Sequence, residues 1–284
     1  MGSMEVQFWG VRGSVPVPGA GTQYFGGNTS CVEVRCGEQR IVLDAGTGLR
    51  ALGNTMHGDA DVTLLLSHLH WDHIQGLPFF PPLYRPTTRL TIYGASDAGV
   101  PFGSALARQM CPPNFPVQWM DLLAAITTHT LSDRQRFRVG DVTVRSVHLD
   151  HPGGGVLAYR LTYDGHSVVY ATDIEQPHAI DRKLRELAEG ADVLIFDSQY
   201  TPSEYRGEDG PSRVGWGHST YEAGAALARQ ASVGEYVLFH HDPSRQDEAM
   251  IALEGRAGRL FHRSRAAREG LVMDIKARQV THAS

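Results

Sequence analysis

The stretch His68-Leu69-His70-Trp71-Asp72-His73 decides how the rest of this sequence is interpreted. It holds three imidazoles and one carboxylate within six residues, directly after the apolar run Val62 to Leu66. Imidazole and carboxylate groups are ligands that suit zinc, manganese or iron. A strand over residues 62–66 would deliver the stretch to a loop at a sheet edge. There its first two histidines can point at one metal ion and its last two residues at a second. We therefore predict a metal centre and not a solvated polar turn.

Composition places the chain among ordinary globular α/β proteins. It has 284 residues, of which 42% are hydrophobic, and this length is within reach of one large domain. The formal net charge is −5. This balance does not suggest nucleic-acid binding, which usually appears as a basic domain or face. It is compatible with a small anionic substrate, because a metal centre supplies local positive charge.

The cysteines and the termini indicate a cytoplasmic protein. Cys31, Cys36 and Cys111 form no CxxC pair, and an odd, sparse set argues against a disulfide framework. No apolar run approaches the ~20 residues of a membrane span. No basic region followed by an apolar one marks a signal peptide. The residues 1–3, Met-Gly-Ser, resemble a cloning scar before Met4.

Strand and helix patterns are spread over the whole chain, and no linker-like stretch divides it. Strands are expected at 6–9, 31–36, 40–43, 62–66, 89–94, 142–147, 157–163, 167–172, 193–196 and 236–239. Helices are expected at 97–110, 179–189, 219–230 (capped by Ser219 or Thr220) and 245–268. We predict a single α/β domain over residues 4–284, with two sheets sandwiched between helices. The proline-rich loop 111–116 is either a rigid connector or a wall over a pocket, and both interpretations stay open.

Six of the ten predicted strands share one regularity, which is that a residue able to bind metal follows the end of the strand. These are Asp44, His68, His148 or His151, Asp173, Asp197, and His240 or His241. Polar groups at one sheet edge are how α/β enzymes build their sites. The first metal would be held by His68, His70 and one later histidine, and the second by Asp72, His73 and another. Asp173 would bridge them. A bridging hydroxide between two such ions could attack an ester or a phosphodiester.

The chain resembles the metallo-β-lactamase fold, a four-layer αββα sandwich, over essentially its whole length. The resemblance rests on Asp44, His68-x-His70-x-Asp72-His73, His151, Asp173 and His241, in that order. Three further motifs resemble the phosphodiesterase branch that contains tRNase Z and the cyclic-phosphate phosphodiesterases. They are Phe8-Trp9-Gly10-Val11-Arg12-Gly13-Ser14-Val15-Pro16, Tyr170-Ala171-Thr172-Asp173 and Gly217-His218-Ser219-Thr220. The resemblance implies a hydrolase with two divalent ions, zinc first and manganese or iron(II) as alternatives. The family is often dimeric, so a homodimer is compatible with it.

The resemblance also assigns roles around the reaction. In that branch the histidine of the His-Ser-Thr motif lies near the leaving oxygen and is steadied by an acidic residue. Here these would be His218 and Asp197. His218 would protonate the departing alkoxide, a role that suits a near-neutral pKa. The family often has glutamate at the position of Asp197, so the shorter side chain departs from its pattern. Asp72 would bind the second metal and also contact the bridging water.

At two ligand positions the sequence offers two histidines each, and the resemblance favours one of each pair. His151, which precedes Pro-Gly-Gly and an Ala-Tyr strand, fits the third ligand of the first metal better than His148. His241, which begins His-Asp-Pro-Ser-Arg, fits the last ligand better than His240. By strand alternation His240 would then face the opposite side. The resemblance makes Asp44 a support of the histidine loop through hydrogen bonds and not a ligand.

The substrate expected from these patterns is small. Protruding arms that bind tRNA are commonly inserted between the third ligand and the bridging aspartate, but residues 152–172 have room for only one hairpin. The acidic net charge agrees, because tRNA binding depends on Lys and Arg. We expect a phosphodiesterase acting on a small or cyclic phosphodiester, with neither long RNA nor a membrane as partner. The alternatives are a tRNA 3′-processing ribonuclease, or a lactonase or thioesterase that uses the same site.

Overall fold

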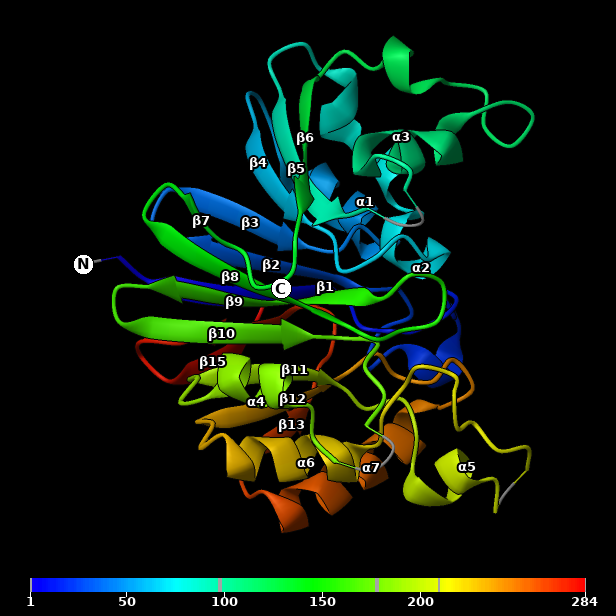
Figure 1. Cartoon of the computed structure of the whole chain (residues 1–284), viewed down its shortest axis with the longest axis vertical. Helices are drawn as coiled ribbons and strands as arrows, with labels where there is room; N and C mark the ends of the chain where they lie inside the picture. The colour runs from blue at the N-terminus through cyan, green and yellow to red at the C-terminus, as the bar shows by residue number, and fades with distance from the viewer. Residues whose placement is uncertain (1, 97–98, 177–178, 209, 284) are drawn as a thin grey trace.

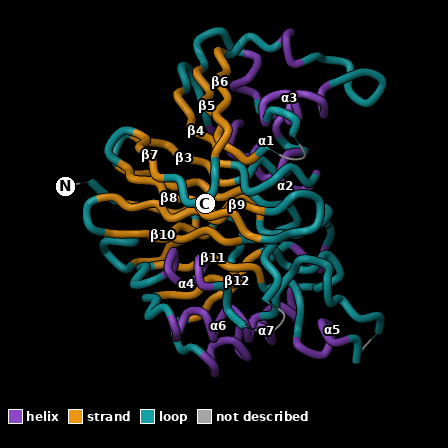
Figure 2. Tube along the Cα trace, in the orientation of Figure 1, coloured by secondary structure: helices purple, strands orange, loops and turns teal. Residues whose placement is uncertain are grey.

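The computed structural model describes residues 2–96, 99–176, 179–208 and 210–283. Within these ranges the strands form two sheets (Figures 1 and 2). The eight-stranded sheet has the order β15-β14-β1-β2-β3-β4-β5-β6. Its strands are β1 (Met4–Gly10), β2 (Cys31–Cys36), β3 (Gln39–Leu43), β4 (Asp61–Leu65), β5 (Arg89–Ala95), β6 (Ala125–Leu131), β14 (Leu271–Asp274) and β15 (Gln279–His282).

The second sheet has seven strands in the order β13-β12-β11-β10-β9-β8-β7. They are β7 (Arg136–Val139), β8 (Val142–Leu149), β9 (Val156–Tyr163), β10 (His166–Ala171), β11 (Val193–Asp197), β12 (Glu235–Phe239) and β13 (Ser264–Ala266). The α-helices are α1 (Gly48–Thr55), α2 (Trp71–Ile74), α3 (Phe102–Ala107), α4 (Arg182–Ala188), α5 (Pro202–Arg206), α6 (Tyr221–Gln230) and α7 (Asp247–Leu260).

Strand alternation builds the four layers. In β10, Val168 and Tyr170 belong to the core between the two sheets. Their neighbours Val169 and Ala171 belong to a second core, together with apolar residues of α4, α6 and α7. A third core joins the outer face of the eight-stranded sheet to α1 and α3. Successive strand residues point to opposite faces, so one strand serves two cores. The predicted αββα sandwich is confirmed, and Figure 1 shows the helices on its outer faces.

The predicted C-terminal helix over 245–268 is too long. α7 ends at Leu260, and residues 264–266 form β13, which pairs in parallel with β12. Ala266 is buried in the core beneath α7, and this pairing outweighs helix propensity. Helix α6 begins as predicted, with Thr220 Oγ1 accepting from the backbone N–H of Ala223. Of the predicted helix 97–110, residues 97 and 98 lie outside the described part of the chain.

Parallel pairing brings the functional strand ends together. β3 and β4 are parallel in the first sheet, and β10, β11 and β12 are parallel in the second. Their carboxyl ends therefore meet at one edge of the sandwich. Among the described residues, no helix has both the length and the apolar character needed to cross a bilayer.

Candidate metal centre

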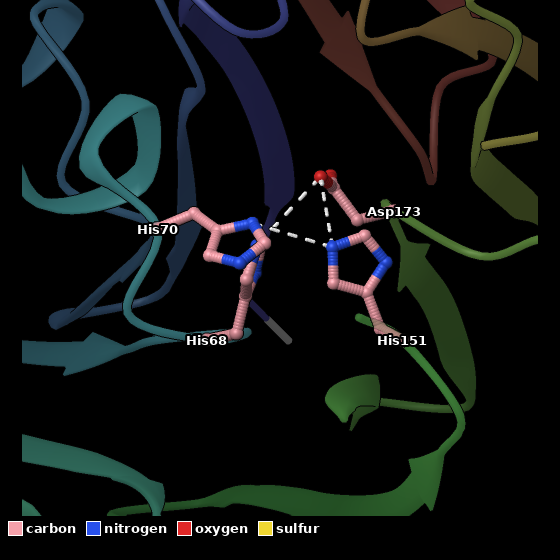
Figure 3. Close-up of side chains that lie close together, drawn as sticks. All are labelled: His68, His70, His151 and Asp173. Carbon is pink, nitrogen blue, oxygen red and sulfur yellow. Dashed lines mark hydrogen bonds and ion pairs between the residues drawn. The ribbon is translucent and has the colours of Figure 1, made fainter. Parts of the chain in front are cut away.

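Seven side chains from distant parts of the sequence converge at that edge. One group consists of His68, His70, His151 and Asp173, and the other of Asp72, His73, Asp173 and His240. Within each group the candidate ligand atoms lie within 4.8 Å of one another. Figure 3 shows the first group, with His68 and His70 facing His151 and the carboxylate of Asp173 above them. Asp173 belongs to both groups, so its two oxygens can serve two ions.

The spacing of the ring nitrogens fits divalent metal ions. His70 Nδ1 and His151 Nε2 are 3.3 Å apart, and so are His73 Nε2 and His240 Nε2. Two nitrogens that each lie 2.0–2.1 Å from a tetrahedral zinc ion are separated by about 3.3–3.4 Å. In addition, His68 Nε2 is buried and has no hydrogen-bond partner among the described residues. A metal ion would satisfy this orphaned nitrogen.

The ionisation states of the first group suit metal binding. Burial lowers the pKa of His151 to about 4 and holds the pKa of His68 well below its usual value. Burial alone would raise the pKa of Asp173, but the neighbouring His240 and His73 outweigh it and hold that pKa well below its ordinary value. Neutral imidazoles and ionised carboxylates are the ligand forms.

The pKa of His73 shows that the carboxylates of the second group favour positive charge beside them. Burial by itself would lower its pKa, but the carboxylates of Asp72, Asp173 and Asp44 raise it well above its usual value. The buried carboxylates therefore favour a positive charge beside them. A bound metal ion would supply that charge without a proton on the imidazole.

Asp44 supports the histidine loop, as the resemblance implied. Its Oδ2 accepts from His73 Nδ1 and Tyr170 Oη, both at 2.7 Å, and from Ser67 Oγ. Its Oδ1 accepts from the backbone N–H of Ser67. These bonds fix the ring orientation of His73, so that Nε2 faces the site.

Of the two candidates for the third ligand of the first group, the structure places His151 in the cluster. Its Nε2 faces His70, and its Nδ1 donates to the C=O of Gly217. His148 lies on β8 instead and lines the neighbouring cavity.

The structure contradicts the choice of His241 as the last ligand, because His240 and not His241 lies in the second group. His240 Nε2 lies 3.1 Å from Asp72 Oδ2, while its Nδ1 donates to Gln199 Oε1. His241 points away from the cluster and donates from Nε2 to the C=O of Ala267. β12 ends at Phe239, the residue before His240, and His240 takes the left-handed conformation with φ 59°. Strand alternation therefore does not extend to this pair.

His218 and Asp197 form a close pair beside the second group. His218 Nδ1 is 2.8 Å from Asp197 Oδ2, and the His218 and His240 rings are stacked with centroids 5.0 Å apart. Burial opposes charge on His218, but Asp197, by its charge and this hydrogen bond, raises the pKa of His218 to about 9. The aspartate reaches this histidine although it is shorter than the family's glutamate. The pKa is also higher than the near-neutral value expected from the sequence.

The glycine-rich opening segment closes one side of the site. The backbone N–H of Ser14 donates to Asp72 Oδ2 at 2.7 Å. A Cβ on Gly13 would lie 2.5 Å from the His240 ring, so only glycine allows this approach. The opening motif therefore acts through its backbone.

Sequence reasoning missed two polar residues of this region. Gln199 orients His240, and Glu175 binds the backbone on either side of Trp216. Neither belongs to a recognisable motif. The available signal was position, since each follows a predicted aspartate at a strand end by two residues.

A cavity of about 760 Å³ adjoins the first group. It is lined by His148, Leu149, Asp150, His151, Pro152, Gly154, Gly155, Ile174, Glu175, Gln176, Ala179, Asp181, Val214, Gly215 and Gly217. These described lining residues include three carboxylates and neither lysine nor arginine. The proline-rich loop 111–116 contacts another segment, where the Phe115 ring packs edge-on against Phe79.

Comparison with known proteins gives the family. Residues 39–241 match the family model described as the beta-lactamase superfamily domain, and the chain belongs to this superfamily. A ribonuclease Z of Lacticaseibacillus casei is 26% identical over 303 residues, covering 91% of each chain.

Solved structures agree on the fold. The metallo-β-lactamase fold protein YhfI from Bacillus subtilis has a TM-score of 0.71 at 21% identity, covering 96% of this chain and 99% of its own. A diphosphatase from the PhnP family has a TM-score of 0.68 at 17% identity, covering 95% and 96%. Together, the superfamily and the His/Asp cluster define a metal-dependent hydrolase.

Proposed function

We propose that this protein is a phosphodiesterase that acts on a small or cyclic phosphodiester with two divalent ions, zinc first. The observation that carries the proposal is the His218–Asp197 pair beside His240 and Asp173. Hydrolysis of an ester with an alkoxide leaving group needs a proton donor at the departing oxygen. A histidine held by a carboxylate next to the metal groups is such a donor.

The chain's own residues divide the task. Bound divalent ions would supply Lewis acidity and a water of lowered pKa. His68, His70 and His151 would hold one ion, Asp72, His73 and His240 the other, and Asp173 both. Asp197 accepts from His218 Nδ1, which leaves Nε2 to carry the transferred proton. Asp72 Oδ2, held by the N–H of Ser14, is fixed at the second group and can orient a water there.

The cavity beside His151 supports a small substrate over long RNA. An RNA arm would carry further phosphates into this space, where Asp150, Glu175 and Asp181 contribute negative charge. RNA affinity depends on Lys and Arg that neutralise phosphates. The segment between His151 and Asp173 holds β9 and β10, which pair as a hairpin. The ribonuclease Z relative makes pre-tRNA cleavage the second candidate.

The cellular setting belongs to the same proposal. The three cysteines are free, which supports a reducing, cytoplasmic compartment. We propose no membrane partner, and a homodimer is compatible with the family.

The test is a matrix of metals and substrates on purified protein. Zn²⁺, Mn²⁺ and Fe²⁺ are each paired with bis-p-nitrophenyl phosphate, cyclic nucleotides, a lactone, a thioester and a pre-tRNA. We expect phosphodiester turnover to exceed lactone and thioester turnover, and His218→Ala to lower kcat on cyclic nucleotides by about 10²–10⁴-fold. His262→Ala, at an exposed histidine after α7, is the control. Dominant lactonase, thioesterase or pre-tRNA activity, or an unaffected His218→Ala variant, would refute the proposal.

A further inference from the structure

Glu175 gathers three hydrogen bonds at the edge of the site. Its Oε1 accepts from the Tyr205 hydroxyl and from the backbone N–H of Gly215, the latter at 2.7 Å. Its Oε2 accepts from the backbone N–H of Gly217 at 2.9 Å. Glu175 follows Asp173 by two residues, whereas its partners lie on α5 and on the segment before α6. One carboxylate thus ties the loop after β10 to the segment 213–218.

Gly217 connects this carboxylate to the metal centre. Its N–H donates to Glu175, while its C=O accepts from His151 Nδ1 at 3.2 Å. Gly217 has φ 87°, and a Cβ there would lie 2.4 Å from His151 Nδ1. His218 is the next residue. The backbone that Glu175 holds therefore orients one candidate ligand and carries the proton donor.

The charge of Glu175 is directed at this backbone. Among the described residues, no Lys or Arg forms an ion pair with it. Hydrogen bonds from N–H groups to a carboxylate are about twice as strong as neutral ones. Ser219 Oγ also donates to the C=O of Ile174, so the two loops keep a second link that does not involve Glu175.

We propose that Glu175 is a positioning residue, which holds segment 213–218 so that His218 faces the leaving oxygen. The inference rests on the proposed function of His218. Glu175 itself need not touch the substrate. The loss of kcat on substituting Glu175 should therefore be larger for substrates whose leaving group depends more strongly on protonation.

The experiment compares Glu175→Gln, Tyr205→Phe and His218→Ala on aryl phosphodiesters whose leaving phenols have rising pKa. Glutamine keeps the shape but turns an NH₂ group toward a backbone N–H. Misplacement of a catalytic group by 1 Å costs about 10²-fold. We expect Glu175→Gln to lower kcat by about ten- to a hundredfold on the least acidic phenol and clearly less on the most acidic, with KM little changed. Tyr205→Phe removes one of the three bonds and should show the same trend, only weaker.

A second readout does not depend on turnover. Hydrogen exchange of segment 213–219 should be faster in Glu175→Gln than in the parent protein. Glu208→Gln, at an exposed glutamate that pairs with Arg206, is the matched control and should change neither exchange nor kcat.

The outcomes separate the two ideas. In one outcome, kcat of His218→Ala depends more steeply on phenol pKa than kcat of the parent protein, while Glu175→Gln lowers kcat by the same factor on every ester. This outcome refutes the positioning role and leaves the proposed function standing. Unchanged exchange in segment 213–219 also refutes the positioning role. If His218→Ala shows no steeper dependence, the proposed function fails first.

Discussion

His240 and His241 are adjacent in sequence but have different surroundings, so a pair of alanine variants tests the metal centre. His240→Ala removes one of the four donors of the second group. Substituting a residue that only supports a ligand costs about 10–100-fold in metal affinity, or about 1.4–2.8 kcal/mol. Loss of a direct ligand should cost at least as much. We expect metal content after dialysis against a weak chelator to fall from two ions per chain to one.

His241→Ala should act on stability alone. Its ring is fully buried and donates to the C=O of Ala267. Removing the donor leaves that carbonyl unsatisfied, which costs about 1–3 kcal/mol, before the cost of the cavity. The melting temperature should therefore fall, while both ions remain bound.

Metal content by mass spectrometry and melting by calorimetry separate the two variants. The site assignment is refuted if His241→Ala loses an ion while His240→Ala keeps both. It is also refuted if both variants retain two ions with unchanged affinity.

Three more perturbations follow from the geometry. Asp197→Asn should lower kcat on cyclic nucleotides by about ten- to a thousandfold, less than the roughly 10²–10⁴-fold contribution of general acid catalysis, because His218 itself remains. A steady-state rate equal to that of the parent would contradict the pairing with His218. Gly217→Ala should lower the metal affinity of the first group by about 10–100-fold, because its Cβ would lie 2.4 Å from His151 Nδ1. Chelator competition measures this affinity, and an unaltered value would count against the support of His151 by Gly217. Complete chelation should lower the free energy of unfolding by about 2.7 kcal/mol per site, relative to protein in a free-ion concentration of 100 times Kd. Added Zn²⁺ should restore this free energy. An unchanged unfolding curve would speak against metal binding by the folded state.

The sequence predicted the layers because two-sided burial is visible in it. Residues 193–196 form a continuous apolar run, as expected of strands covered on both faces. The turn chemistry around Thr220 likewise gave the start of α6. What stayed hidden were short edge strands such as β13, whose pairing depends on a neighbouring strand far away in sequence.

The candidate site was predictable wherever a side chain type and a strand end coincided. Asp44, His68 and Asp173 fall in this class, because parallel strands bring their carboxyl ends to one edge. The choice between His240 and His241 was not, because it depends on one backbone dihedral angle that no residue pattern specifies. Glu175 was hidden for another reason: two of its three hydrogen-bond partners are backbone N–H groups, which leave no trace in residue types.

The same dihedral angles link the site to stability. Asp44, Asp173 and His240 all have positive φ, at 62°, 56° and 59°. Each lies within two residues of the end of β3, β10 or β12. A non-glycine residue with left-handed backbone destabilises the folded state by about 1–3 kcal/mol. Three such residues together are a large cost beside the ~5–15 kcal/mol stability of a domain.

The strain persists because each of these residues is held by its contacts. Hydrogen bonds from Ser67, His73 and Tyr170 hold Asp44. The polar contacts of Asp173 and His240 lie instead largely within the cluster, among groups that would bind metal. The turns at those two strand ends should therefore depend on the ions more than the turn at Asp44 does. Metal removal should loosen the ends of β10 and β12 before the end of β3, and hydrogen exchange of the metal-free protein would reveal that order. Equal loosening at all three ends would show that the ions do not stabilise these turns.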